Sequence, residues 1–128
     1  MNRIDVLEWF AGSGYKFKYN HSAVDMACVH RNISVLEWFS SSVYEFKYSK
    51  SAINDASLCG HTTILEWFDK SKYEFKYNTN AINNAIIEEH INILDWFKNS
   101  KYDFIYDKYV LDSAKPLILE WFAANIKN

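Results

Sequence analysis

The sequence predicts an all-α solenoid of stacked helix pairs joined by short extended finger loops. A Trp recurs at positions 9, 38, 67 and 96, always 29 residues apart, and a fifth follows early, at 121. Each stands in the phrase Leu-Glu/Asp-Trp-Phe. A second phrase, Tyr-x-Phe-x-Tyr, keeps the same 29-residue step, at 15–19, 44–48, 73–77 and 102–106. A fixed period of this length is typical of stacked repeat architectures.

The first helix of a unit is clearest at residues 51–58. Small or apolar side chains at 52, 53, 56 and 57 form one helical stripe, and Gly60 suits the turn that ends the helix. Two sets of polar residues could cap these helices, and the sequence does not choose between them. One set is Asn20, Ser49, Asn78 and Asp107, and the other is Ser22, Ser51 and Asn80.

The second helix of the same unit covers residues 63–70. Ile64, Leu65 and Phe68 form its apolar stripe and Trp67 broadens it, as expected of a helix covered on two sides. Residues 73–77 then alternate aromatic with charged, which predicts an extended segment with its three aromatic rings on one face. These rings and the Trp-Phe pairs are expected in the core, so Trp67→Ala should cost ~3–5 kcal/mol.

The whole chain, 1–128, is expected to form a single repeat domain. It divides into a partial first repeat (1–19), three full repeats (20–48, 49–77 and 78–106) and a shortened last repeat (107–128). The last repeat lacks four residues between Ala114 and Leu117, and Pro116 stands where its second helix would begin. The chain opens on a lone second helix at 3–10, so we expect nine helices, one alone and four pairs. That apolar opening helix makes a poor terminal cap, which also fits a structural segment of a longer array.

Composition excludes several classes of protein. A net charge of −2 and a pI of about 6.1 argue against nucleic acid as a partner. No apolar run approaches the ~18–20 residues of a membrane span, and no signal peptide is visible, so we expect a cytoplasmic protein without a membrane partner. Cys28 and Cys59 fall in different columns of the repeat, which predicts no disulfide and a reducing compartment.

Residues 51–65, SAINDASLCGHTTIL, resemble the ankyrin consensus T-P-L-H-x-A-A-x-x-G-H-x-x-V-V. Trp67-Phe68 then stands where that consensus has Leu-Leu, and Gly14 matches the Gly after its second helix. The repeat is four residues shorter than the 33 of the family, and the loss falls in the finger. The consensus Pro is replaced by Ala23, Ala52 and Ala81, and its His by Asp25, Asn54, Asn83 and Asp112.

The short finger and the aromatic phrases look like the divergent ankyrin arrays of giant viruses that infect amoebae. This resemblance implies recognition of another protein, in a host cytoplasm if the chain is viral. It also implies no enzymatic activity, no cofactor and no small-molecule substrate. Two alternatives are a substrate-recognition adaptor of a ubiquitin ligase and the structural segment described above.

Neither the histidines nor the carboxylates suggest catalysis or a metal. His61 and His90 share a column at about 10 Å, too far for one zinc ion, and are expected to bond loop carbonyls or face solvent. An acidic column is expected to be a solvated ladder paired with a lysine column, or else an acidic stripe for a basic partner. The acids are Glu8, Glu37, Glu66, Asp95 and Glu120, and the lysines are Lys18, Lys47 and Lys76.

Columns that vary between units are the candidates for partner contact, because a scaffold keeps its packing columns. In the ankyrin family the fingers and first helices line the concave binding face, and the resemblance therefore implies a surface made of three variable columns. They are His21, Lys50, Thr79 and Lys108 at the finger, Met26, Asp55, Asn84 and Ser113 on the first helix, and His30, Cys59 and Glu88 near its end.

Overall fold

The structure, a computed structural model, describes residues 4, 7–9, 12 and 19–126. Over these residues it is all-α, as predicted, with no strand. The elements are α2 (Ser22–Val29), α3 (Ile33–Ser41), α4 (Lys50–Leu58), α5 (Thr62–Lys70), α6 (Thr79–Ile87), α7 (Ile91–Asn99), the 3-10 helix η1 (Lys108–Ser113) and α8 (Pro116–Asn125). Residues 4, 7–9 and 12 are also helical, whereas the rest of the predicted helix at 3–10, Gly14 and Lys18 lie outside the described residues.

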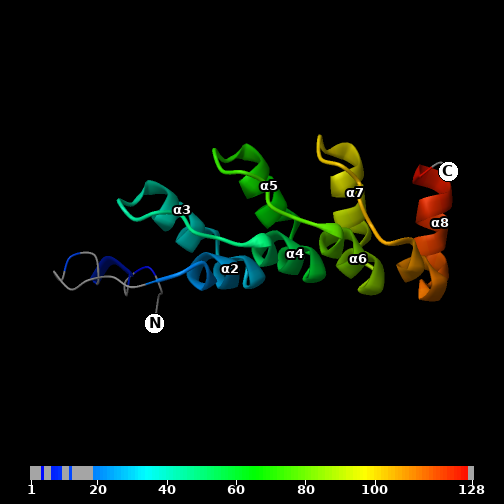
Figure 1. Ribbon diagram of the computed structural model, residues 1–128, viewed down its shortest axis with the longest axis horizontal. Coiled ribbons are helices and arrows are strands. Elements are labelled where there is room, and N and C mark those ends of the chain that lie inside the picture. Colours follow the sequence, from blue (N-terminus) through cyan, green and yellow to red (C-terminus); the bar gives the residue numbers. More distant parts are fainter. Residues whose placement is uncertain (1–3, 5–6, 10–11, 13–18, 127–128) are drawn as a thin grey trace.

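The helix pairs follow one another along a single axis (Figure 1). Helices α2, α4 and α6 form one row and pack on their neighbours, while α3, α5 and α7 each pack on the first helix of their own pair. Extended finger segments lead from the second helix of one pair to the first helix of the next. The described chain is therefore an elongated row of helix pairs ending at α8.

Polar side chains at the start of α2, α4 and α6 settle the capping question in favour of the upstream set for these three helices. Each accepts a hydrogen bond from the backbone N–H two residues later. The bonds are Ser22 N to Asn20 Oδ1 (2.8 Å), Ser51 N to Ser49 Oγ (3.2 Å) and Asn80 N to Asn78 Oδ1 (2.9 Å).

The last unit departs from this pattern. Asp107 makes no capping bond, and the segment after it is a 3-10 helix where we predicted an α-helix. One cause is visible: the missing four residues shorten the connection from this segment to α8. Pro116 does begin the second helix, as predicted.

Left-handed residues end the first helices. Arg31 (φ 53°), Gly60 (φ 77°) and Glu89 (φ 59°) occupy one column, and the N–H of the next residue reaches back to a carbonyl in the helix. These bonds are Asn32 N to Ala27 O (2.7 Å), His61 N to Ala56 O (2.9 Å) and His90 N to Ala85 O (2.8 Å). The turn predicted at Gly60 is confirmed, and two units form it without glycine.

The core runs through the row of pairs as repeated columns. Phe39, Phe68 and Phe97 are almost fully buried, as are the Leu column (Leu36, Leu65 and Leu94) and the Ala column (Ala27, Ala56 and Ala85). The Trp column differs from expectation, because Trp38, Trp67 and Trp96 are only partly buried at the edge of this core.

Rings from neighbouring units stack beside each Trp. Phe46 of one finger lies 4.0 Å from Tyr73 and 5.5 Å from Trp67 of the next unit, centroid to centroid, with nearly parallel planes. Phe75 repeats the arrangement with Tyr102 (3.9 Å) and Trp96 (5.6 Å). Each finger therefore ties its own unit to the following one.

Candidate interaction surface

The predicted contact residues lie along the row of first helices. Eight of the eleven are exposed: His21, Met26, His30, Lys50, Cys59, Glu88, Lys108 and Ser113. The other three, Asp55, Thr79 and Asn84, are partly buried. Helices α2, α4, α6 and η1 pack on one another in order, so these residues follow one another along the row of first helices.

Some residues of this surface also form hydrogen bonds with other residues of the chain. Asn84 Nδ2 donates to the Asn54 carbonyl of the preceding unit at 3.2 Å, and His21 Nδ1 lies 2.8 Å from Asp25 Oδ2. Burial, and then the charge of Asp25, raise the pKa of the Asp55 carboxyl. Lys50 and Lys108 take part in no ion pair among the described residues, so both charges are open to a partner.

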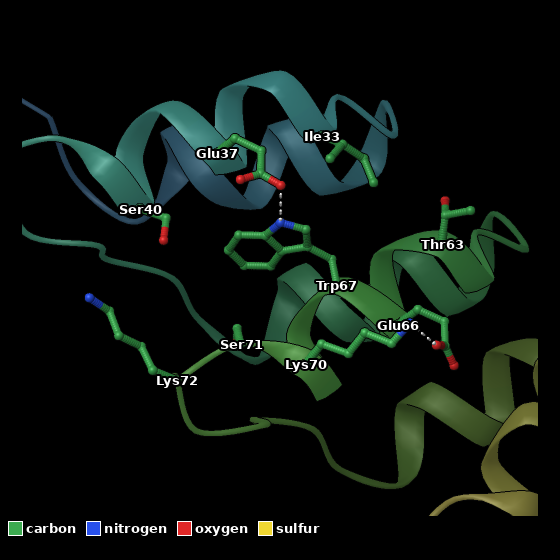
Figure 2. Close-up of a pocket in the computed structure, with 9 residues that line it drawn as sticks. All are labelled: Ile33, Glu37, Ser40, Thr63, Glu66, Trp67, Lys70, Ser71 and Lys72. Atoms are coloured by element: carbon green, nitrogen blue, oxygen red, sulfur yellow. Dashed lines mark hydrogen bonds and ion pairs between the residues drawn. The ribbon is translucent and has the colours of Figure 1, made fainter.

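The opposite side of the molecule is hollowed between successive second helices. A groove of about 560 Å³ lies between α3 and α5, with Ile33, Glu37 and Ser40 on one wall and Thr63, Trp67 and Lys70 on the other. Figure 2 shows Glu37 facing the indole of Trp67 across it. A similar groove of about 490 Å³ separates α5 from α7, where Trp96 faces Glu66.

Three residues of the acidic column, Glu37, Glu66 and Asp95, each accept a hydrogen bond from the Trp of the following unit. Trp67 Nε1 donates to Glu37 Oε1 at 3.1 Å, Trp96 Nε1 donates to Glu66 Oε1, and Trp121 Nε1 donates to Asp95 Oδ1 at 2.7 Å. Glu37 and Asp95 are exposed, as expected of a solvated ladder, but the expected pairing with the lysine column is wrong for these acids. The described lysines of that column turn to aromatic rings instead: the ammonium nitrogens of Lys47 and Lys76 lie 4.7 Å and 4.6 Å from the ring centres of Tyr19 and Tyr48.

The two histidines of the shared column reach back to the preceding unit. His61 Nε2 lies 3.1 Å from the Val29 carbonyl, and His90 Nε2 lies 2.9 Å from the Leu58 carbonyl. A carbonyl accepts only, so each Nε2 carries the proton and donates. These rings therefore bond carbonyls at the last residues of α2 and α4 rather than the loop carbonyls we expected, and they link successive units.

Sequence reasoning missed a second set of bonds between units. Asp25, Asn54 and Asn83, in the place of the consensus His, are buried and pair with the capping residue 24 positions later. Their partners are Ser49, Asn78 and Asp107, at side-chain distances of 2.5, 2.9 and 2.8 Å. The signal available was that this column holds only Asp or Asn in every unit.

No group of three His, Cys, Asp or Glu side chains among the described residues is arranged to hold a metal ion. Cys28 and Cys59 are both free thiols. Burial, and then the charge of Asp25, raise the pKa of the Cys28 thiol, which disfavours the reactive thiolate. Helices in the described part of the chain are all too short or too polar to cross a bilayer.

Comparison with known proteins gives no relative. No protein-family model matches the chain, and neither a curated protein nor a solved structure is significantly similar to it.

Proposed function

We propose that this chain is an ankyrin-like repeat module that recognises another protein through its first helices and fingers, without catalysis. One observation carries the proposal. The columns that bond or pack units together keep their chemistry, whereas the columns that vary, such as Lys50, Cys59 and Glu88, are mostly exposed along the row of first helices. A scaffold that holds packing constant and varies its exposed side chains is suited to recognition.

Local geometry supports the ankyrin-like part of the proposal. The left-handed residue at Arg31, Gly60 and Glu89 falls at the Gly of the consensus Gly-His pair. The His at 61 and 90 spans two units, a role that explains its place in the repeat. The shortened finger leaves the first helices as the larger part of the proposed surface.

The chemistry of the surface favours a partner of mixed polarity. Lys50 and Lys108 supply positive charge, Glu88 supplies negative charge, and Met26, 46% exposed, supplies an adaptable apolar contact. No single charge dominates, so shape and a few central contacts would decide the affinity. The resemblance to viral arrays makes amoebal host proteins the first source to search.

Affinity capture followed by calorimetry tests the proposal. The immobilised chain is exposed to amoebal extract, the retained protein is identified, and its Kd is measured against wild type and against a Lys50→Glu/Lys108→Glu variant. Reversing both charges should weaken binding by about tenfold or more. Lys98→Glu, an exposed change on α7, is the matched control and should leave Kd unchanged.

Two results would count against the assignment. If the Lys98→Glu variant loses binding and the double variant keeps it, the contact surface lies on the second helices. If no protein is retained from extract at any salt concentration, the recognition function itself is contradicted.

A further inference from the structure

The last unit exposes apolar residues in columns that are polar elsewhere. Tyr109 is 68% exposed where the other units have Ser22, Ser51 and Asn80, and Leu117 is 55% exposed where they have Ser34, Thr63 and Asn92. Ala123 likewise stands where the other units have Ser40, Asp69 and Lys98. Ala124 stands where they have Ser41, Lys70 and Asn99. Exposed apolar side chains gathered in one unit are typical of an interaction site.

Leu119 shows which side of α8 is uncovered. It is 45% exposed, whereas its equivalents Leu36, Leu65 and Leu94 are fully buried. Each of those three units is followed by another unit. Leu119 therefore lies on the side of the last unit that, elsewhere in the chain, meets a further repeat.

Glu120 points to the same conclusion from its polar chemistry. Its equivalents Glu37, Glu66 and Asp95 each accept a bond from the Trp of the following unit. Glu120 is exposed and makes no hydrogen bond or ion pair within the described part of the chain. The last unit thus presents both the apolar and the acidic half of the contact between units.

The first described helical residues present the other half. Trp9 belongs to the column whose later members bond the acid of the preceding unit, and it is 59% exposed, whereas Trp121 is 8% exposed. Gly12, one helical turn further on, is exposed too, and a Cβ placed there would meet nothing within 4 Å. Trp67 and Lys70, the equivalents of these two residues, line the groove toward α3.

We propose that a second copy of this chain docks head to tail, with its Trp9 face against Leu119 and Glu120 of α8. The contact continues the interface already present between units, which is why another copy fits both the apolar and the acidic features. A net charge of only −2 opposes such stacking weakly. The two faces differ, so the assembly is heterologous and grows as an open chain of copies. This self-association uses residues distinct from the proposed partner surface.

Sedimentation velocity over about 5 to 500 µM, a range that covers weak association, tests the proposal. The weight-average mass should rise from 15.1 kDa with concentration and pass the dimer value without a plateau. Leu119→Glu and Trp9→Glu should each hold the chain at the monomer mass, with circular dichroism showing that both fold. Val43→Glu, at a site 96% exposed on a finger, is the control and should assemble like wild type.

Mixing the two end variants gives the sharpest result. Each retains one intact face, so together they should form a 1:1 dimer that grows no further. The proposal is overturned if wild type stays monomeric at every concentration. It is equally overturned if wild type stops at a dimer that Trp9→Glu leaves intact, because α8 would then pair with α8.

Discussion

Single residues in the left-handed conformation show where the units are unequal. A residue other than glycine destabilises the folded state by ~1–2 kcal/mol when it adopts this conformation. Glycine avoids this strain, but its greater freedom in the unfolded chain destabilises the folded state by ~0.5–1 kcal/mol. Arg31→Gly should therefore raise the free energy of unfolding by about 0.5–1 kcal/mol in a urea melt. An unchanged midpoint would mean that interactions of the Arg31 side chain offset the strain of its backbone.

Gly60 offers the converse test in the same column. A Cβ there would lie 3.1 Å from Nδ1 of His90, whose Nε2 holds the Leu58 carbonyl. Gly60→Ala should lower the unfolding free energy by about 1–3 kcal/mol, because it adds backbone strain and pushes the His90 ring away from its hydrogen bond with the Leu58 carbonyl. A loss under about 0.5 kcal/mol in the same melt would show that the turn relaxes freely.

Tyr48 predicts how stability depends on alkaline pH. Burial is the main cause that raises its pKa from 10.0 to about 12, and its hydroxyl has no hydrogen-bond partner among the described residues. Its stabilising contribution is complete below pH 10 and is lost as the pH rises toward 12, by about 1.4 kcal/mol per pH unit. Urea melts at several pH values should show this loss for wild type and a shallower one for Tyr48→Phe. Equal slopes would contradict it.

Among the helices, the bond from acid to indole is the contact to measure. A double-mutant cycle of Glu66→Ala and Trp96→Phe should give a coupling of about 0.5–1.5 kcal/mol, because the Glu66 side chain is 46% exposed and solvent weakens a charged bond. Glu120→Ala, without a partner in the described residues, should stay within about 0.5 kcal/mol of wild type. Its unfolding is best followed at low concentration, where copies do not associate. Zero coupling would make the bond incidental.

The helices show which features could be predicted from the sequence and which could not. The period placed the helices, because apolar spacing and turn residues are local. It did not reveal that Glu66 bonds forward to Trp96, because that contact depends on side-chain reach between units. Neighbouring helix positions point about 100° apart, so an acid beside a Trp can face the next unit while the Trp faces the previous one. The exposure of the Trp column was misjudged for the same reason.

Across the whole molecule, stability should behave as a chain of linked units. Phe68, 1% exposed in a central unit, packs against rings from the preceding finger, and Phe68→Ala should cost ~3–5 kcal/mol. Phe122, 7% exposed in α8, meets rings of the preceding finger and no later unit among the described residues, so its truncation should cost less. Hydrogen exchange should show lost protection spreading through α4–α7 in the first case and confined to η1 and α8 in the second. Uniform loss in both would indicate one all-or-none unit.

The buried pairs that join successive units also restrict how such a chain could be rearranged. Asn54 and Asn83 each carry a donor and an acceptor, so the middle modules could be exchanged or duplicated and still find matching partners. Asp25 carries only acceptors when ionised and relies on the hydroxyl of Ser49. Excising residues 49–106 would set Asp25 against Asp107, two carboxylates with no proton between them. Losing both middle modules by recombination is therefore disfavoured, whereas losing or duplicating a single one is not.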